Sequence, residues 1–326
     1  MSKFHTACYL FFGGFFFCTT PSIHAQDSTL IDTAFVPFVA YWATGDTYTF
    51  KVTKVKKSWN DIKVNKIDST SYLSTFTVQD STDSSYTISY RFQNAINSIP
   101  GITAEQLKSI PEFGMEEAIY KTNELGEFLY VENTEEIGER IKRGLNKLVA
   151  LTKDRPKETY EKVKRFISPF MQIYGSKDGV EYTLLNELQY IHFPLGAELS
   201  SIDTFTYEDA LPNPMGGEPL KANASIYFQE VDTLDYYCQF THRMVPEQED
   251  IFNFVKEIVS SMLPEGTDTE EALKNAELNI ETENIFLYFY YPGIPYYISS
   301  LRNMDVSVDG VHTYTTEQIF IEMVDE

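Results

Sequence analysis

The stretch NIFLYFYYPGIPYYIS, residues 284–299, constrains the fold more than any other part of the chain. It sets seven aromatic side chains within twelve positions. In an extended strand successive side chains point to opposite faces, so Phe286 and Tyr288 share one face while Leu287 and Phe289 share the other. Both faces of this strand are therefore apolar. Such a strand lies between two layers of its own protein, or it borders a space that takes an apolar ligand.

Most of the remaining chain also has a β-type pattern. Alternating apolar and polar residues separated by turn residues predict hairpins at 71–93, 115–131 and 222–244. Asp309 and Gly310 give the strongest hairpin-turn signal. A loop rich in proline and glycine interrupts the pattern at 212–219, with Pro212, Pro214, Gly216 and Gly217. Strands and helices do not alternate regularly, which argues against a parallel doubly wound sheet.

Helical periodicity is confined to two regions. Asn133 as cap, with Glu136 as its capping-box partner, predicts a helix from 134 to 149. Pro156 opens a second helix that runs to 173, with a kink expected at Pro169. A third helix starts at 247, and a shorter one is expected at 269–278. These helices need an apolar surface, and the sheet supplies it.

The predicted fold is therefore α+β. We expect a large, curved, mostly antiparallel sheet of about nine to eleven strands, with the amphipathic helices of 134–173 and 247–278 packed on one face. Residues 26–44 form an N-terminal tail that leads into the first strand. Residues 45–326 form a single domain, or two similar halves at 45–200 and 201–326.

The first 25 residues have the pattern of a Sec-type secretory signal. Lys3 and His5 precede an apolar run at 7–17, and the small residue Ala25 stands before the expected cut. Export to the periplasm or the cell exterior follows, with the mature protein either free or held at the outer membrane. Cys18 raises a lipoprotein alternative, but the bulky Phe17 stands where a lipidation site needs a small residue. No other segment is long and apolar enough to span a bilayer.

Charge and cysteine content narrow the partners. Cleavage would leave Cys238 as the only cysteine, so no internal disulfide is expected. Residues 1–175 carry 20 basic and 20 acidic side chains, whereas 176–326 carry 6 and 28. Such an acidic surface repels phosphate backbones, which argues against nucleic acid as a partner. Near the N-terminus, a basic cluster either faces a polyanion or protects strand edges from pairing; its members are Lys51, Lys54, Lys56, Lys57, Lys63 and Lys66.

No catalytic or cofactor motif stands out, so we expect neither an enzyme nor a bound cofactor or metal. The histidines of the mature chain, His192, His242 and His312, lack the spacing of metal ligands. Asp80 and Asp83 occupy a turn without the features of a calcium loop. Cys238 has the setting of a small core residue. No residue pattern supports a hydrolase that acts on envelope glycans or peptides.

Four features in this order carry a resemblance: a signal ending at Ala25, then GDTYTF, TNELGEFLYVENTEEI and LPNPMGGEP. Together they resemble a group of uncharacterised secreted proteins of Bacteroidota. The resemblance implies export but no activity and no site residues. At the level of fold, a curved antiparallel sheet with helices against one face is similar to the periplasmic half-barrels that carry lipoproteins and lipids.

Two functions remain open from the sequence. The first is a non-enzymatic periplasmic binding protein that holds an apolar or lipid-like ligand between sheet and helices. Its expected pocket residues are Phe286, Tyr288, Tyr290, Tyr296 and Tyr297, with Pro212, Pro214, Gly216 and Gly217 at the mouth. The alternative is a structural or protein-interaction module of the cell envelope, in which the aromatic side chains fill a dry core.

Overall fold

The computed structural model describes residues 34–60, 63–93, 104–174, 176–184, 186–211, 219–253, 276–308 and 311–324. Residues Thr33–Glu326 form one compact unit. The predicted signal and the loop at 212–218, with its two prolines and two glycines, lie outside the described residues. So do Asp309, Gly310 and most of the region expected to be helical after 253.

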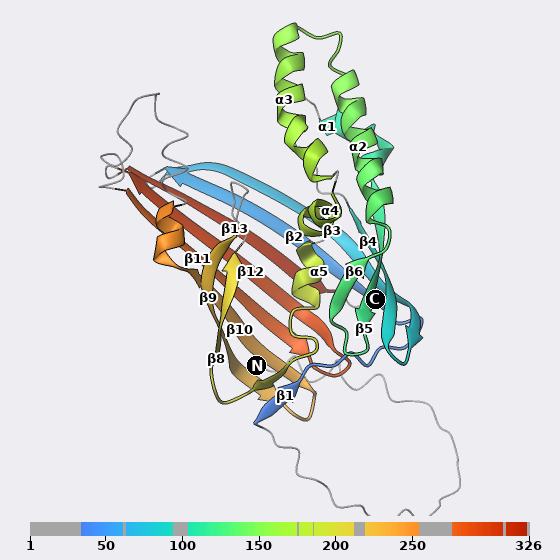
Figure 1. Cartoon of the computed structure of the whole chain (residues 1–326), viewed down its shortest axis with the longest axis vertical. Helices are drawn as coiled ribbons and strands as arrows, with labels where there is room; N and C mark the ends of the chain where they lie inside the picture. The colour runs from blue at the N-terminus through green and yellow to red at the C-terminus, as the bar shows by residue number, and fades with distance from the viewer. Residues whose placement is uncertain are drawn as a thin grey trace, which may run out of the picture. The chain divides into compact units, whose positions relative to one another are not determined.

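An antiparallel sheet of eleven strands dominates the structure (Figure 1). Its spatial order is β6-β5-β4-β3-β2-β13-β12-β11-β10-β9-β8, so the sheet is open, with β6 and β8 as its edges. The first half consists of β2 (Thr47–Asn60), β3 (Lys63–Thr82), β4 (Ser85–Gln93), β5 (Met115–Asn123) and β6 (Phe128–Val131). The second half consists of β8 (Phe205–Leu211), β9 (Leu220–Asp232), β10 (Tyr237–Pro246), β11 (Ala276–Phe289), β12 (Ile294–Val308) and β13 (Val311–Met323).

The hairpins expected from alternation are confirmed. β3 pairs with β4, β5 with β6 and β9 with β10, all antiparallel. β12 and β13, which precede and follow Asp309 and Gly310 in the sequence, are also antiparallel neighbours. β2 and β13 join the two runs of hairpins in the middle of the sheet. A second sheet of two strands pairs β1 (Phe35–Pro37) with β7 (Glu198–Ser200), so part of the expected N-terminal tail is a strand.

The helices lie between the two halves in sequence. They are α1 (Ala104–Lys108), the 3₁₀ helix η2 (Pro111–Phe113), α2 (Thr134–Ala150), α3 (Lys157–Ile173), α4 (Lys177–Leu184) and α5 (Asn186–Ile191). Residues 248–253 are also helical. The expected helix at 269–278 is wrong at its end, because β11 already begins at Ala276 and pairs there with Val308. No helix among the described residues is long and apolar enough to cross a membrane.

Asn133 precedes α2 as expected, but its side chain does not cap the helix. Its Oδ1 accepts a hydrogen bond from the backbone N–H of Ile119 at 2.9 Å, and its Nδ2 donates to the carbonyl of Glu117 at 2.9 Å. The amide therefore ties the start of α2 to β5. An Asn before a helix satisfies the capping pattern in sequence, but here a neighbouring strand competes for its polar atoms.

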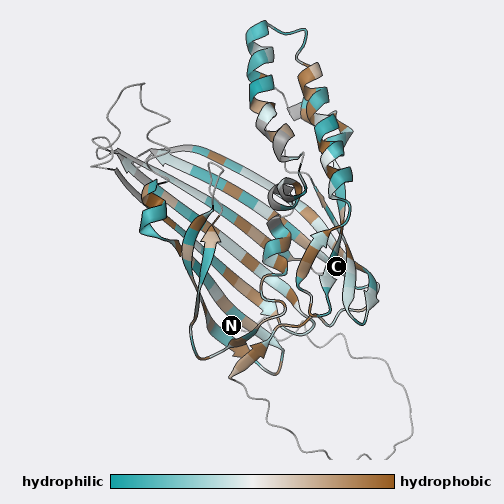
Figure 2. Cartoon of the chain, in the orientation of Figure 1, coloured by the Kyte–Doolittle hydropathy of each residue, from teal (hydrophilic) through white to brown (hydrophobic). Residues whose placement is uncertain are grey.

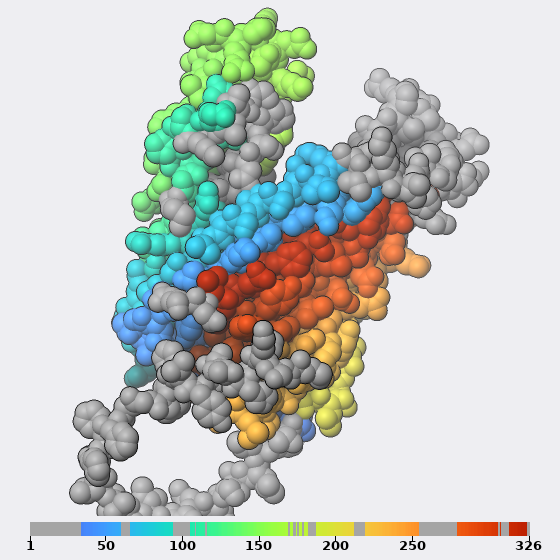
Figure 3. All heavy atoms as spheres, turned by 180° about the vertical axis from the view of Figure 1, so that it is seen from behind, coloured from blue at the N-terminus to red at the C-terminus, as the bar shows by residue number. Residues whose placement is uncertain are grey.

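We call the face of the large sheet that carries α5 the inner face, and the other the outer face. The sheet curves toward the side on which α5 lies (Figure 1). Phe240, Phe286 and Ile298 lie on the inner face and are fully buried. Phe38 packs edge-on against Phe240 with ring centroids 5.5 Å apart. The main core therefore lies between the sheet, α5 and the chain that precedes β2. Seen from behind, β2, β3, β12 and β13 lie directly at the surface (Figure 3).

Candidate functional site

The aromatic strand places its side chains on both faces of the sheet. Phe286 is fully buried on the inner face, stacked between Phe240 at 4.7 Å and Phe193 at 5.1 Å. Tyr288 is also fully buried, and its hydroxyl donates to the carbonyl of Ile191 at 3.2 Å. Within the described part of the chain, both side chains are completely surrounded by other protein atoms. They belong to the core between β11 and α5.

The other expected pocket residues lie elsewhere. Tyr297 pairs with Leu287, and a bulge at Tyr296 shifts the register there. An open hollow of about 530 Å³ on the outer face is lined by Lys51, Leu287, Tyr296, Tyr297, Glu322, Met323 and Val324. Tyr290 is partly buried and donates to the carbonyl of Asp232 at 3.1 Å. The five aromatic residues therefore do not line one pocket, because strand alternation divides them between two faces.

The strand register arranges the inner face in rows that cross the sheet. One mostly polar row crosses five neighbouring strands. In spatial order it contains His242 of β10, Asn284 of β11, Ser300 of β12, Ile319 of β13 and Lys54 of β2. The next row contains Thr282, Arg302, Glu317 and Lys56. We call these two rows the polar band. Polar residues are ordinary at the exposed end of this face, where Lys56 and Glu317 lie, but apolar residues would be the ordinary choice at its buried positions. The buried polar members are His242, Thr282, Asn284 and Ser300.

Apolar clusters border the polar band on both sides. The main core lies on one side, with Phe240, Phe286 and Ile298 in the adjacent row. A second, smaller cluster contains Leu211, Leu220, Ala222, Ala224, Met244 and Ile280, with Tyr207 and Met304 packed against it. The inner face therefore changes from apolar to polar and back to apolar along the strands.

Glu187 of α5 forms the most buried charged contact of this region. Its side chain is fully buried, and Lys54 Nζ lies 2.6 Å from its Oε1. The hydroxyl of Tyr72 donates to the same oxygen. Burial raises the pKa of Tyr72 far above its ordinary value, and the charge of Glu187 raises it further. This contact fixes α5 to β2 and β3.

Beside this contact, Glu187 Oε2 is buried and lacks a hydrogen-bond partner among the described residues. The hydroxyls of Ser74 and Tyr90 are also buried there and lie close enough to each other to interact. Burial raises the pKa of Tyr90, the charge of Glu187 adds to that rise, and the nearby Ser74 hydroxyl opposes it. Buried polar atoms are nearly always hydrogen-bonded to protein or ordered water.

His242 is held in its neutral form at the other end of the polar band. Its Nε2 lies 3.0 Å from the hydroxyl of Tyr207, and its Nδ1 lies 3.2 Å from Nδ2 of Asn284. Burial lowers the pKa of His242 to about 4, although the carboxylate of Asp209 acts in the opposite direction. The ring of Phe193 stacks on the imidazole at 4.5 Å. Asn284 is buried, and its Oδ1 has no partner among the described residues.

Arg302 is the cation of the band that lacks an ion pair. Its Nε donates to Thr282 Oγ1 at 3.4 Å, and no carboxylate of the described residues lies within 4.0 Å of it. Glu317 lies directly opposite on β13 but binds Lys56 at 2.5 Å. Arg302 also acts to lower the pKa of the Tyr190 hydroxyl, which burial raises overall. A partly buried guanidinium without a carboxylate partner suits an anionic group.

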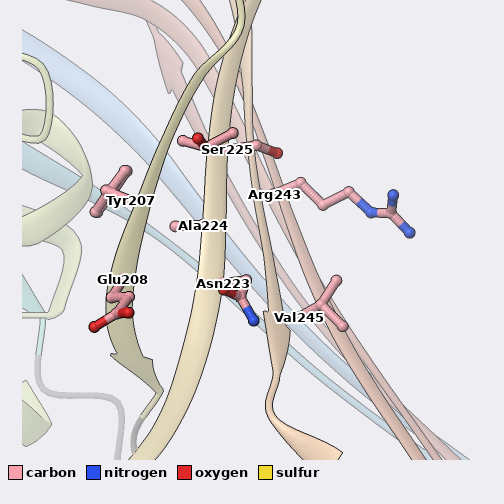
Figure 4. Close-up of a pocket in the computed structure, with 8 residues that line it drawn as sticks. Tyr207, Glu208, Asn223, Ala224, Ser225, Arg243 and Val245 are labelled. Atoms are coloured by element: carbon pink, nitrogen blue, oxygen red, sulfur yellow. The ribbon is translucent and has the colours of Figure 1, made fainter.

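A second hollow of about 510 Å³ opens at the edge of the sheet, across β8, β9 and β10 (Figure 4). The side chains of Arg243, Val245 and Ser225 point away from the side of the sheet on which Tyr207 lies (Figure 4). Arg243 forms an ion pair with Glu281 on β11. Asn223, the first residue of a glycosylation sequon, lies within β9 and lines the hollow. The hollow is open, and the charged residues that line it, Glu208 and Arg243, are exposed.

The other residues singled out in the sequence have ordinary structural partners. Four of the six clustered lysines, Lys51, Lys54, Lys56 and Lys66, lie within 4.0 Å of a carboxylate. Cys238 is fully buried, and burial raises the pKa of its thiol. His192 bonds Tyr120 and Gly126, whereas His242 bonds Tyr207 and Asn284. Within the described ranges no three histidine, cysteine or acidic side chains gather as metal ligands would.

The polar band escaped the sequence reasoning, although β12 carries a signal for it. In Ile298, Ser300 and Arg302, alternate residues of one strand pass from apolar to charged on a single face. That change marks where the core ends. The contribution of Glu187 has no comparable signal, because α5 has only six residues and its buried face depends on the tertiary fold.

Comparisons with known proteins add little to this site. No model of a known protein family matches the sequence, and no curated protein matches it. Among solved structures, Ail, the attachment invasion locus protein of Yersinia pestis, matches at 6% identity, covering 86% of this chain and 100% of that chain, with a TM-score of 0.13. A likeness of that size carries no argument about fold or function.

Proposed function

We propose that the protein is a non-enzymatic binding protein that holds an amphipathic ligand between the inner face of the sheet and the helices. The signal-like residues 1–25 place its action in the periplasm or outside the cell. The ligand's polar head lies on the polar band near Arg302, and its apolar part lies on the adjacent cluster around Ile280 and Met304. The aromatic strand serves as the wall of the core rather than as the pocket.

One observation carries this proposal: the charge count of the polar band. Lys54 is paired with Glu187 and Lys56 with Glu317. Arg302 is the third cation and has no ion pair among the described residues. Burying an unpaired charge is costly, so a partly buried arginine in this setting favours an anion as its partner. The neighbouring apolar cluster favours a ligand that also has an apolar part.

A second candidate is a structural or protein-interaction module of the cell envelope. The observation that favours it is the complete burial of Phe286 and Tyr288 against protein side chains and backbone. In that case the polar band would be filled by the chain itself and by water, and no small molecule would be present.

Native mass spectrometry separates the two candidates. Residues 26–326 are secreted in a Gram-negative host, purified gently and measured before and after organic extraction. A bound mass that extraction removes, and that belongs to an acidic amphipathic molecule, supports the binding protein. A clean mass without ligand, under conditions that preserve the lipids of known carriers, refutes it and favours the structural module.

Two matched variants then locate the ligand. Arg302→Gln removes the proposed partner of the head group, whereas Arg243→Gln removes an arginine of the outer face that is paired with Glu281. Hydrogen bonds to charged groups contribute about 1.5–3 kcal/mol, so Arg302→Gln should lower affinity by roughly 10- to 150-fold. Arg243→Gln should leave affinity unchanged. Equal effects of the two variants would contradict the assignment to the inner face.

A further inference from the structure

The helical hairpin formed by α2 and α3 has a charge opposite to that of the rest of the chain. Residues 134–173 contain 10 basic and 6 acidic side chains, whereas all other residues together contain 16 basic and 42 acidic ones. The hairpin therefore has a net charge of +4 in a protein whose net charge is −22. Figure 2 shows the half of α3 that follows the turn as mostly hydrophilic.

The positive charge is concentrated on α3 and on the turn before it. Lys153, Arg155, Lys157, Lys162, Lys164 and Arg165 are all exposed. Three of the four basic residues of α2 are used in ion pairs: Arg140 pairs with Glu116, Lys142 with Glu139 and Lys147 with Glu112. Lys157, Lys162 and Lys164 have no carboxylate within 4.0 Å among the described residues.

Exposed apolar side chains accompany these cations. Leu151, at the end of α2, is 45% exposed, and Phe166 of α3 is 37% exposed. The opposite sides of the helices are used for packing, since Ile141, Leu145 and Val163 are buried. A lipid interface accepts both cationic and apolar side chains, whereas a nucleic acid backbone offers partners only for the cations. The combination favours a membrane surface.

Distance separates the tip of the hairpin from the strands of the large sheet, although α1 and η2 lie beside it, where Glu112 pairs with Lys147 and Arg155 donates to Gln106. The 17 residues of α2 span about 25 Å from Thr134, where the chain leaves the sheet, to the turn before α3. Figure 1 shows α2 and α3 side by side, with that turn at the end away from β6. The Debye length at physiological ionic strength is about 8 Å. The local charge of the hairpin therefore decides what it attracts, although the whole protein is acidic.

We infer that the α2–α3 hairpin docks on the surface of an anionic phospholipid membrane, with the basic side chains of α3 at the head groups and Leu151 and Phe166 in contact with the acyl boundary. The surface is distinct from the polar band, and the inference does not depend on the proposed ligand. The hairpin lies on the surface and does not cross the bilayer.

Vesicle flotation of residues 26–326 tests this docking. The probes are vesicles of phosphatidylcholine alone and vesicles with about a quarter of phosphatidylglycerol, at low and at raised salt. Binding should require phosphatidylglycerol and weaken with salt. Failure to float with phosphatidylglycerol vesicles, or equal flotation with phosphatidylcholine alone, overturns the inference.

A matched pair of triple variants assigns the surface. Changing Lys162, Lys164 and Arg165 to Gln should lower the partition coefficient by roughly 100-fold, since each basic residue near an anionic surface contributes about a fivefold factor. Changing Lys51, Lys57 and Lys66 to Gln removes the same charge from β2 and β3 and should alter binding by less than about threefold. Circular dichroism checks that both variants are folded. Equal losses in the two variants overturn the assignment to the hairpin.

A competing polyanion is distinguished by the apolar residues. The double variant Leu151→Gln with Phe166→Gln should weaken vesicle binding and leave any binding to double-stranded DNA or polyglutamate unchanged. If the double variant binds vesicles as the unchanged protein does, and the protein binds a soluble polyanion with equal affinity, the partner is a polyanion and the lipid inference is wrong.

Discussion

His192 lets the burial of a titratable group be tested directly. Its Nδ1 lies 2.7 Å from the carbonyl of Gly126, and its Nε2 lies 2.7 Å from the hydroxyl of Tyr120. A carbonyl can only accept, so Nδ1 carries the proton and Nε2 accepts from the tyrosine. The imidazole is therefore neutral and fully satisfied. Burial lowers its pKa from 6.5 to about 4, while the bond to Gly126 opposes that shift.

This shift predicts a loss of stability in acid. Between pH 6.5 and about 4 the unfolded chain binds a proton at His192 that the folded protein does not bind. The free energy of unfolding therefore falls as the pH falls through this window, and His192 makes no contribution above it. A shift of one pKa unit corresponds to about 1.4 kcal/mol, so the full effect is about 3 kcal/mol. At pH 4.5 about 2.5 kcal/mol of it should be lost.

Urea unfolding with and without His192→Gln measures this loss, with Trp59→Phe in both proteins so that Trp42 is the remaining tryptophan whose fluorescence is followed. The indole of Trp42 is buried, with its ring centroid 5.9 Å from that of His192, so it reports on the same region. The readout is the difference in unfolding free energy between the two proteins as a function of pH. Taking this difference cancels the contributions of other titrating groups to the unfolding free energy. One such group is Glu116: burial raises its pKa to about 7, although Arg140 acts to lower it.

The reasoning is refuted if that difference stays constant within about 0.5 kcal/mol from pH 7 to pH 4.5, which is the scatter expected of unrelated surface effects. It is also refuted if the ring protons of His192 titrate near pH 6.5 in the folded protein by NMR. His242, whose pKa is also lowered to about 4, is distinguished by comparing spectra of the His192→Gln variant.

Three further outcomes follow from the packing. Phe286→Ala should lower the free energy of unfolding by about 3–5 kcal/mol, because it leaves a cavity in the core. Tyr297→Ala should lower it by about 1 kcal/mol or less, because Tyr297 lies at an open hollow; urea unfolding of both variants measures the difference. Gly138→Ala should destabilise the protein by about 1–3 kcal/mol, although alanine has the better helix propensity. The reason is that the new Cβ would lie 2.6 Å from the carbonyl oxygen of Tyr174. A neutral or stabilising result in thermal unfolding would contradict that contact. Cys238 should react with Ellman's reagent only as fast as the mature protein unfolds, since its thiol is fully buried and burial raises its pKa; rapid labelling without denaturant would show that the strand is accessible.

Local patterns predicted the elements that local physics determines. Alternation located the hairpins because one face of each strand is buried and the other is wet. Helical periodicity located α2, whose buried residues Ile137, Ile141, Leu145 and Leu148 are those expected from the spacing. The end of β11 nearest Ala276 was missed because its preceding residues also fit a helical pattern, and pairing with β12 decides the outcome.

Contacts between distant segments were beyond the sequence. β1 has three residues and gains its strand conformation from β7, which lies more than 150 positions later in the chain. Tyr288 and Tyr297 lie on opposite faces because Tyr297 pairs with Leu287, the neighbour of Tyr288. The bulge at Tyr296 places that residue beside Tyr297 at the outer hollow, and Pro295 is its local signal, since proline within a sheet often marks a bulge. The expectation that all five aromatic residues share a pocket neglected this alternation and also required the inner face to be open at Phe286.

The polar band is difficult to explain as a device for stability. A buried ion pair rarely stabilises a fold more than apolar residues of similar volume, and removing one partner is strongly destabilising. Here Lys54 pairs with the buried Glu187, and among the described residues Glu187 Oε2 and Asn284 Oδ1 lack a hydrogen-bond partner. A sheet selected only for stability would continue the row of Phe240, Phe286 and Ile298 beneath α5 and along the strands. Sites that depart from the most stable arrangement are where function is expected. The departure is concentrated in the two adjacent rows that contain Arg302, and this concentration is the reason to look for the ligand there rather than along the aromatic strand.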